Sequence, residues 1–314
     1  MNYSIIIFLV CFVLSSVSCS GKNGAKVSLK EKHTEANTET EYDPAAKQID
    51  MFYCTDEDRK IFDDYISYIK PFKSTQESEL IIKTAFFFIN KPYVASTLEI
   101  EPEGLVVNMR EFDCTTFVET VLALSRIIKL FDQPTLENFC GQLLNIRYRR
   151  GSINNYTDRL HYFSDWIYEN ETRVHVKDIT KEIGGEPYKL NLNFMSTHPD
   201  SYKQLKSNSE YVDIIKKKES DISGRNVYSI IPKERIVQCG KEMRDGDIVC
   251  FVTDIEGLDI SHVGFIYYNE GQLTFIHAST TAKRVIVNSQ PLSVYAEKNG
   301  HNIGVMIVRP YISR

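Results

Sequence analysis

Residues 261–279 read SHVGFIYYNEGQLTFIHAS. Two apolar runs in this stretch flank the turn-forming residues 269–272, a pattern that is typical of a β-hairpin. His262 opens the first strand of that hairpin, and His277 closes the second. Because antiparallel strands run in opposite directions, the pattern predicts that the two imidazoles are neighbours.

The segments around this hairpin predict an α+β fold. Short apolar runs predict strands at 248–252, 263–268, 273–276, 284–287 and 305–308. Apolar residues at helical spacing predict helices earlier in the chain: one with apolar residues from Phe52 to Ile69, a second announced by a Ser74–Glu77 capping box, a third over Asp113–Leu130, a fourth after Pro134, and a fifth over Tyr162–Glu169. Helices first and strands last favour an antiparallel sheet with helices on one side.

Residues 147–240 give a weaker structural signal. The stretch is rich in Tyr, contains the turn-forming pair Gly184 and Gly185, and carries a solvated charge run at Lys216–Lys218. We interpret it as an insert within one domain that spans residues 51–314.

Composition excludes several classes of protein. The 314 residues are 42% hydrophobic and 25% charged, with 37 Lys and Arg against 42 Asp and Glu, a net charge of −5. Without an excess of positive charge, nucleic acid is not an expected partner. Only one stretch is continuously apolar, which excludes a protein with several membrane spans.

The first 18 residues have the pattern of a signal peptide. Their apolar run is too short to span a bilayer, and the small residues Ser16 and Ser18 precede Cys19 as a signal peptidase requires. Cys19 at this cut indicates a bacterial lipoprotein whose thiol carries diacylglycerol; simple cleavage and an uncleaved anchor are the alternatives. Residues 19–50 are polar and predict a flexible tether. We therefore expect an exported protein of a bacterial cell envelope, periplasmic or membrane-anchored.

Five cysteines lie beyond the leader, and Cys114 stands apart from the others. Cys54, Cys140 and Cys250 sit among large apolar residues, which favours inert buried thiols. Cys114 follows Asp113, the expected N-cap of the third helix. Because free N–H groups and the peptide dipoles stabilise an anion at a helix start, this position favours a thiolate. The alternative is a capped helix whose first turn happens to contain a cysteine.

A cysteine nucleophile needs a base, and His262 and His277 are the candidates. One imidazole would take the thiol proton while the other fixes its tautomer and orientation. A metal held by the pair is the alternative, but no third ligand accompanies them at a suitable spacing. The remaining histidines of the predicted domain are expected to be structural or at the surface: His161, His175, His198 and His301.

Five blocks of sequence, taken in order, resemble the NlpC-type family of papain-like cell-wall cysteine hydrolases. They are KPYV at 91–94, FDC at 112–114, DGDIV at 245–249, SHVG at 261–264 and IHA at 276–278. The insert and the stretch LHYFSDW at 160–166 are similar to one branch of that family, the N-acetylmuramoyl-L-alanine amidase-like proteins. The resemblance implies a papain-like fold in which N-terminal helices pack on a C-terminal antiparallel sheet.

The resemblance also implies a catalytic site. Cys114 matches the nucleophile, His262 the general base and His277 the orienting residue. Two departures accompany the match. Thr115 and Thr116 replace the usual Ser-Gly, and the two histidines are 15 positions apart, which implies a longer turn or a bulge in the hairpin.

Three further residues match the family's substrate contacts. Tyr93 matches an aromatic residue near the oxyanion, and Asp113 and Ser261 match residues that contact the substrate peptide. The implied substrate is peptidoglycan or its muropeptide fragments, cut between N-acetylmuramic acid and L-alanine without a metal or nucleotide cofactor. The alternatives are an endopeptidase that cuts the stem peptide between D-Glu and the diamino acid, and a non-catalytic peptidoglycan-binding module.

Overall fold

The computed structural model of the protein describes residues 52–313. The expected signal peptide, Cys19 and the tether lie outside these residues. The helices are α1 (Asp56–Ile69), α2 (Glu77–Phe87), α3 (Cys114–Leu130), α4 (Leu136–Arg147), α5 (Phe163–Thr172), α6 (Phe194–Thr197), α7 (Lys203–Lys206), α8 (Ser209–Ser223), α9 (Ile236–Cys239) and α10 (Leu292–Lys298). The strands are β1 (Phe52–Tyr53), β2 (Leu105–Val106), β3 (Val176–Asp178), β4 (Glu186–Pro187), β5 (Ser229–Pro232), β6 (Ile248–Thr253), β7 (Ile260–Asn269), β8 (Gln272–Ser279), β9 (Arg284–Val287) and β10 (Asn302–Pro310).

An antiparallel sheet forms the centre of the molecule, as the order of the predicted strands suggests. Its strands run β4-β5-β10-β6-β7-β8-β9, and β3 also pairs with β10. Strand β6 is buried along its whole length, with the sequence IVCFVT. A continuous apolar run of this kind is expected where both faces of a strand are covered.

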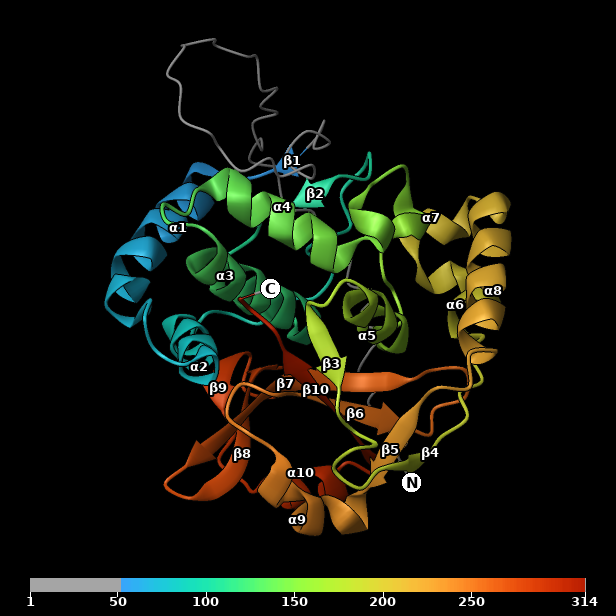
Figure 1. Ribbon diagram of the computed structural model, residues 1–314. Helices are drawn as coiled ribbons and strands as arrows, with labels where there is room; N and C mark the ends of the chain where they lie inside the picture. The colour runs from blue at the N-terminus through green and yellow to red at the C-terminus, as the bar shows by residue number, and fades with distance from the viewer. Residues whose placement is uncertain (1–51, 314) are drawn as a thin grey trace.

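Helices cover both faces of the sheet, so the expectation of helices on one side only is wrong. Figure 1 shows α3, α4 and α5 on one side of the sheet and α9 and α10 on the other. The physical reason is the alternation along the strands: Phe251, Ile266 and Phe275 form a second hydrophobic core away from α3, and α10 closes it with Leu292.

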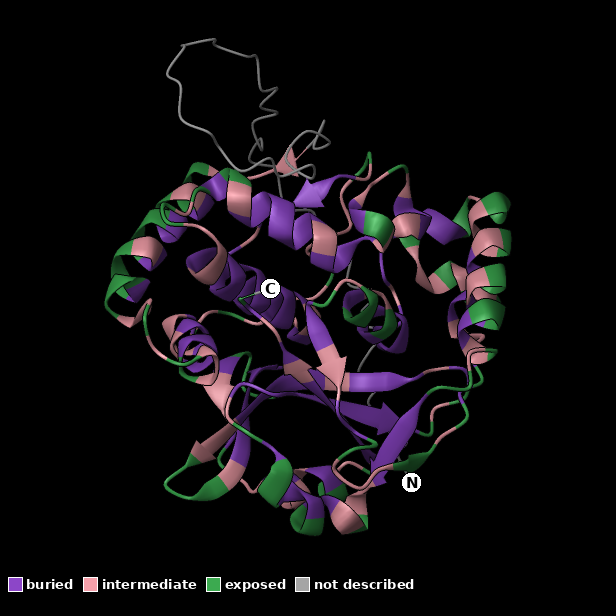
Figure 2. Ribbon diagram, viewed as in Figure 1, coloured by how far each residue is buried: buried purple, intermediate pink, exposed green. Residues whose placement is uncertain are grey.

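The central helix α3 carries the sequence CTTFVETVLALSRIIKL, and most of its residues are buried. A helix that is apolar on all sides belongs inside a protein. Its ring contacts include Phe117 on Phe265 of β7, with ring centroids 5.9 Å apart. Figure 2 shows α3 in the buried colour through most of its length. The packing holds the first residue of α3 beside the strands of the predicted hairpin.

Two expectations about the N-terminal helices are wrong. Phe52 and Tyr53 form β1, because α1 begins only at Asp56, after a capping box between Thr55 and Asp58. The Ser74–Glu77 capping box is absent: α2 has Gln76 as its N-cap, with no side-chain cap. The Glu77 carboxylate instead accepts a hydrogen bond from the backbone N–H of Ile312, 3.3 Å away.

The hairpin between the two histidines has a short turn, so the expectation of a longer turn or a bulge between β7 and β8 is also wrong. Asn269 pairs with Gln272, and the two intervening residues, Glu270 and Gly271, have φ values of 51° and 84°. Positive φ at both central residues is the mark of a type I′ turn. The residues that separate His262 from His277 therefore extend strands β7 and β8 and not the turn.

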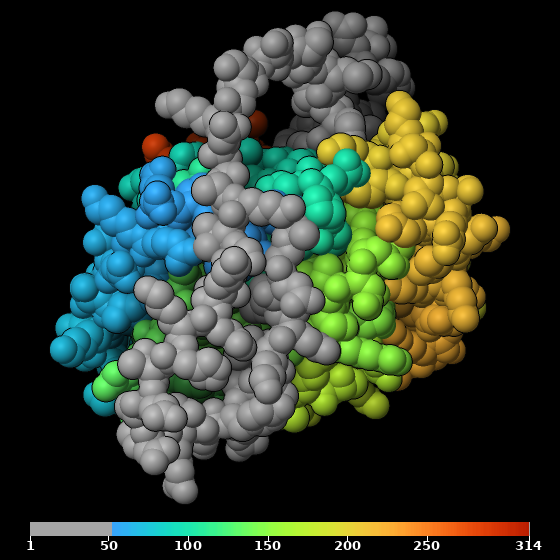
Figure 3. Space-filling model, turned by 90° about the horizontal axis from the view of Figure 1, so that it is seen from above, coloured from blue at the N-terminus to red at the C-terminus, as the bar shows by residue number. Residues whose placement is uncertain are grey.

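Residues 147–240 contribute to the sheet and to the helical face. Strands β3, β4 and β5 extend the sheet beyond β10, while α8 packs against the helices of this segment. Seen from the helical side, α1 and α8 lie at opposite edges of the molecule, with residues of the intervening segments between them (Figure 3). No helix within residues 52–313 combines the length and the apolar character needed to cross a membrane.

Candidate active site

Cys114 is the first residue of α3, and Asp113 caps the helix. The Asp113 Oδ1 atom accepts hydrogen bonds from the backbone N–H of Thr116 at 2.7 Å and from its hydroxyl at 2.9 Å. The Thr116 hydroxyl oxygen in turn accepts from the backbone N–H of Asp113 at 3.0 Å. The threonine that departs from the family pattern therefore completes a capping box, which fixes where the helix and its cysteine begin.

Cys114 is buried, with 7% of the residue exposed, and its surroundings favour the neutral thiol. Burial, followed by the charge of Asp113, raises the pKa of the thiol to about 12. The backbone N–H of Val263, directed at the sulfur, and the Thr115 side chain act in the opposite direction. Burial therefore acts against the thiolate that a helix start favours.

The structure brings His262 and His277 together from neighbouring strands. His262 Nε2 lies 2.6 Å from His277 Nδ1, and the two ring centroids are 4.8 Å apart at an interplanar angle of 85°. This contact leaves Nδ1 as the His262 nitrogen not engaged by His277. Since Val263 directs its N–H at the Cys114 sulfur, the thiol lies against the peptide that immediately follows His262.

Both imidazoles are neutral near pH 7. Burial lowers the pKa of His262 to about 4. Burial, together with the neighbouring His262, holds the pKa of His277 well below its ordinary value. A neutral His262 is able to accept a proton, which is the state that a general base requires. Within residues 52–313, the buried Nε2 of His277 has no hydrogen-bond partner.

Aromatic rings enclose the histidine pair on the side of the second core. The Phe275 ring lies 4.4 Å from the His277 ring, and the Phe251 ring lies 6.0 Å from the His262 ring, centroid to centroid. Tyr295 of α10 completes the enclosure, 6.3 Å from His262 and 5.9 Å from His277. Sequence reasoning missed Tyr295, because no motif links it to the hairpin and the predicted elements did not include α10.

Tyr93 is placed beside the segment that leads into Cys114. Its backbone N–H donates to the carbonyl of Lys283 at 2.9 Å, and it forms a parallel bridge with Phe112. Ser261 is buried, and its hydroxyl donates to the carbonyl of Phe251 on β6 at 3.3 Å. Asp113 and Ser261 thus both have structural partners within the protein.

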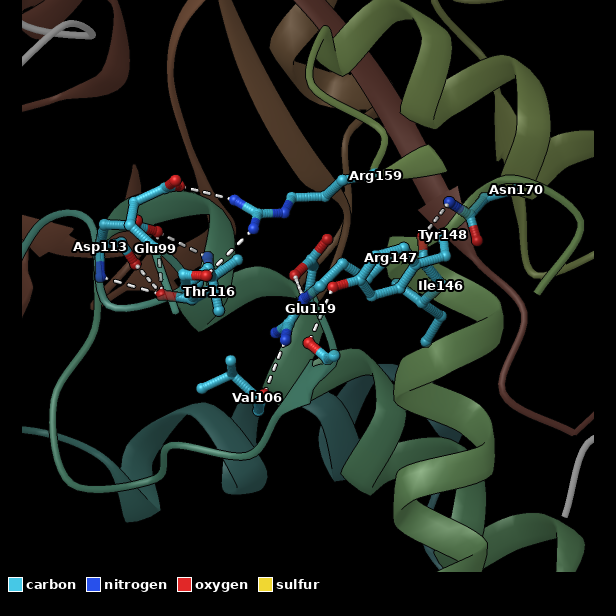
Figure 4. Close-up of polar contacts among 12 residues, drawn as sticks. Glu99, Val106, Asp113, Thr116, Glu119, Ile146, Arg147, Tyr148, Arg159 and Asn170 are labelled. Atoms are coloured by element: carbon cyan, nitrogen blue, oxygen red, sulfur yellow. Dashed lines mark hydrogen bonds and ion pairs between the residues drawn. The ribbon is translucent and has the colours of Figure 1, made fainter. Parts of the chain in front are cut away.

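A buried ionic network supports α3 next to the cap. One turn beyond Thr116, Glu119 accepts from Arg147 Nε at 2.6 Å, and Arg147 also donates to the carbonyl of Val106 at 2.7 Å. Arg159 pairs with Glu99 at 2.6 Å nearby. Figure 4 shows these pairs beside the Asp113–Thr116 cap. Because the charges are buried, their partners fix the position of α3 relative to α4.

Some other predicted positions lie apart from this site. His175 contacts Asn170 and His301 contacts Asp254, while His161 contacts the carbonyl of Tyr156. The five cysteines within residues 52–313 are all free thiols: Cys54, Cys114, Cys140, Cys239 and Cys250. In the same part of the chain, no three side chains of His, Cys, Asp or Glu converge as metal ligands would.

Residues 83–304 match the sequence profile of the AmiA-like family, described as N-acetylmuramoyl-L-alanine amidase-like. The chain belongs to the N-acetylmuramoyl-L-alanine amidase-like family. The family match contains the hairpin with its two histidines, Cys114 with its cap, and α10. The amidase-like assignment indicates an enzyme.

Solved structures share the fold of this chain, and one of them is named as an amidase. An N-acetylmuramoyl-L-alanine amidase from Bacteroides uniformis is 36% identical, with a TM-score of 0.71, over 75% of this chain and 99% of that one. A Bacteroides fragilis protein named as a candidate xylanase is 37% identical, with a TM-score of 0.68, over 72% of this chain and 99% of that one. A Legionella pneumophila protein at 21% identity and a TM-score of 0.60 shares the amidase-like fold over 80% of this chain and 94% of its own. Among curated proteins, no significant match to the chain is found.

Proposed function

We propose that this protein hydrolyses the amide bond between N-acetylmuramic acid and L-alanine in peptidoglycan or its muropeptide fragments, through Cys114, His262 and His277. The proposal rests on the contact between the start of α3 and β7. The Cys114 sulfur faces the N–H of Val263, and the preceding residue, His262, is oriented by His277 at 2.6 Å. A nucleophile, a base and an orienting group in this order are the parts that covalent amide hydrolysis requires.

The reaction begins with proton transfer from the thiol. As the Cys114 sulfur bonds to the carbonyl carbon of the lactyl group, the thiol proton moves to Nδ1 of His262. The carbon–nitrogen bond then breaks, and the same proton passes to the departing alanine nitrogen. A thioester remains on Cys114, and the stem peptide leaves with a free amine.

Water completes the cycle. His262 takes a proton from a water molecule as its oxygen bonds to the thioester carbon. The carbon–sulfur bond breaks, the sulfur recovers a proton from His262, and the lactyl group leaves as a carboxylic acid. In both steps, the charged form of His262 donates a hydrogen bond from Nε2 to Nδ1 of His277. His277 must be neutral, because only then can its Nδ1 accept this hydrogen bond.

The neutral resting state has a consequence for the first step. Burial disfavours both the thiolate of Cys114 and the protonated form of His262. The thiol therefore loses its proton together with the attack on the substrate, when the developing charge moves onto the carbonyl oxygen.

The family and the Bacteroides uniformis amidase favour the muramoyl–alanine bond over the rival stem-peptide bond. The xylanase name of the Bacteroides fragilis protein does not suit this site, because glycosidases use two carboxyl groups flanking the bond. Here the carboxylate next to Cys114, that of Asp113, caps α3.

A digest of one defined muropeptide tests the choice of bond. The domain lacking residues 1–50 is incubated with a disaccharide tripeptide, and the products are weighed by mass spectrometry. Free tripeptide and free disaccharide support the amidase. A disaccharide that retains a dipeptide identifies the endopeptidase instead, and an unchanged substrate that stays bound to the protein identifies the binding module.

We further propose that the domain acts in the cell envelope, held there by a lipid on Cys19. The support is the sequence alone, namely the apolar leader that ends at Ser18 and the polar residues 19–50. Incorporation of labelled palmitate into the full chain, lost in Cys19→Ala, is the expected result. Equal labelling of the variant would show that Cys19 carries no lipid.

A further inference from the structure

Tyr295 lies directly beside the proposed catalytic pair, on an element that no sequence motif marked. Its ring centroid is 6.3 Å from that of His262, 5.9 Å from that of His277 and 4.8 Å from that of Phe275. The side chain is half-buried, so its ring is packed while part of it reaches the surface.

Helix α10 is firmly attached, which fixes the position of Tyr295. Leu292 and Ala296 of the same helix are fully buried. The Asn302 side chain donates to the carbonyl of Ala296 at 3.1 Å, and the Thr274 hydroxyl donates to the carbonyl of Gln290 at 2.8 Å just before the helix. The ring of Tyr295 is therefore held against the histidines by the fold.

The Tyr295 hydroxyl is available to a ligand. Within residues 52–313, it has no hydrogen-bond partner. Burial, followed by the proximity of the Cys114 sulfur, raises the pKa of Tyr295 to about 12. The hydroxyl therefore keeps its proton throughout the neutral range, and it lies near enough to the sulfur to sense a charge there.

Several backbone N–H groups beside Cys114 are already engaged within the protein. The N–H groups of Thr115 and Thr116, which a helix start would offer to an oxyanion, both point to the Asp113 carboxylate. The N–H of Val263 is directed at the sulfur. A carbonyl that is attacked by Cys114 develops negative charge on its oxygen and needs preorganised donors in this place.

We propose that the Tyr295 hydroxyl donates a hydrogen bond to the carbonyl oxygen of the scissile amide and stabilises the negative charge that forms as Cys114 attacks. This inference rests on the proposed function. It makes Tyr295 a catalytic residue that contacts the substrate, and α10 the element that supplies it.

The test compares Tyr295→Phe with Tyr268→Phe. Tyr268 donates from its hydroxyl to the carbonyl of Gly240 at 2.8 Å, and its loss serves as the matched control outside the site. We expect kcat for muropeptide hydrolysis to fall by about 10²-fold in Tyr295→Phe, with KM changed far less, since the donor acts on the transition state. Tyr268→Phe keeps the wild-type rate.

Two further measurements separate this role from a structural one. Alkylation of Cys114 by iodoacetamide builds no charge on a carbonyl oxygen, so its rate in Tyr295→Phe equals that of the wild type. The pH profile of the remaining activity keeps its shape, because the hydroxyl does not change its protonation. A loss of alkylation equal to the loss of hydrolysis would assign Tyr295 to the packing of the histidines instead.

The outcomes for the two proposals are distinct. Hydrolysis by the wild type together with an equal kcat in Tyr295→Phe overturns the inference and leaves the proposed function standing. A wild-type protein that cleaves no muropeptide overturns the proposed function, and the inference falls with it.

Discussion

Gly264 lies across from His277 on the neighbouring strand, and a Cβ atom at Gly264 would be 3.0 Å from the Cβ of His277 and 2.7 Å from the carbonyl oxygen of Ile276. Gly264 is two residues beyond His262 on the same face of β7. A side chain at position 264 would therefore stand between His277 and its diagonal neighbour His262. The glycine of the SHVG block is explained by this close approach.

Gly264→Ala is therefore expected to separate the two imidazoles. The added methyl group must displace the backbone of β8, the Cβ of His277 or the ring of Phe275, which costs about 1–3 kcal/mol of stability. We expect kcat/KM to fall by at least about 10²-fold, since the base loses its orienting partner. Urea denaturation and steady-state kinetics measure the two effects. Wild-type activity in a folded variant would show that the 2.6 Å contact is unimportant.

Alkylation of Cys114 should depend on His262. Burial raises the pKa of Cys114 to about 12 and that of Cys54 to about 11. On these pKa values alone, Cys114 would not react before Cys54. In the wild type we expect iodoacetamide to modify Cys114 first, because His262 removes its proton. In His262→Gln the rate at Cys114 drops more than about 10-fold, while that at Cys54 stays constant as the internal control. Equal rates at both thiols in the wild type would remove His262 as the base.

Acid should destabilise the fold through its neutral buried histidines. Burial, and then the nearby Arg126, lowers the pKa of His175 to about 3, whereas the unfolded chain binds a proton near pH 6.5. Below pH 6.5 the unfolded state therefore binds more protons, and stability falls by about 1.4 kcal/mol per pH unit for such a group until its folded pKa is reached.

Urea denaturation at pH 7 and at pH 5 measures this effect. The loss of stability between the two pH values should be smaller in His175→Gln than in the wild type. An identical pH dependence in His175→Gln and the wild type would show that His175 does not contribute.

Removing one partner of the buried Glu119–Arg147 pair is expected to destabilise the fold more than replacing both partners with apolar residues. Glu119→Gln leaves the Arg147 guanidinium, with a side chain only 3% exposed, without its counter-charge. We expect a loss of about 3–5 kcal/mol in the free energy of unfolding. The double variant Glu119→Leu with Arg147→Met should recover much of this loss. A single variant within about 1 kcal/mol of the wild type would mean that water reaches the guanidinium.

Much of the site could be predicted from the sequence because its determinants are local. The turn at Glu270 and Gly271 sets the register of the hairpin, and the hairpin places His277 beside His262. Asp113 before an apolar helical run marks the start of α3, and the structure places the cap there. Each of these signals depends on a few adjacent residues.

The parts that could not be predicted depend on distant segments. The pKa of Cys114 follows from its burial against β7, which no property of the helix start reveals. Tyr295 reaches the site only because α10 folds back over β8. In the DGDIV block, Asp247 pairs with Arg309 at 2.8 Å and Asp245 accepts from the N–H of Tyr268 at 2.7 Å, so these carboxylates hold strands together.

The mass of the acyl-enzyme shows most directly whether Cys114 is the nucleophile and which bond is cut. Wild-type domain and a disaccharide tripeptide are mixed, quenched in acid within the first turnover, and the protein is digested and weighed. We expect a thioester on the peptide that contains Cys114, with the mass of the disaccharide lactyl group and no amino acid attached. An adduct that carries stem-peptide residues, or hydrolysis that proceeds in Cys114→Ala at the wild-type rate, would contradict it.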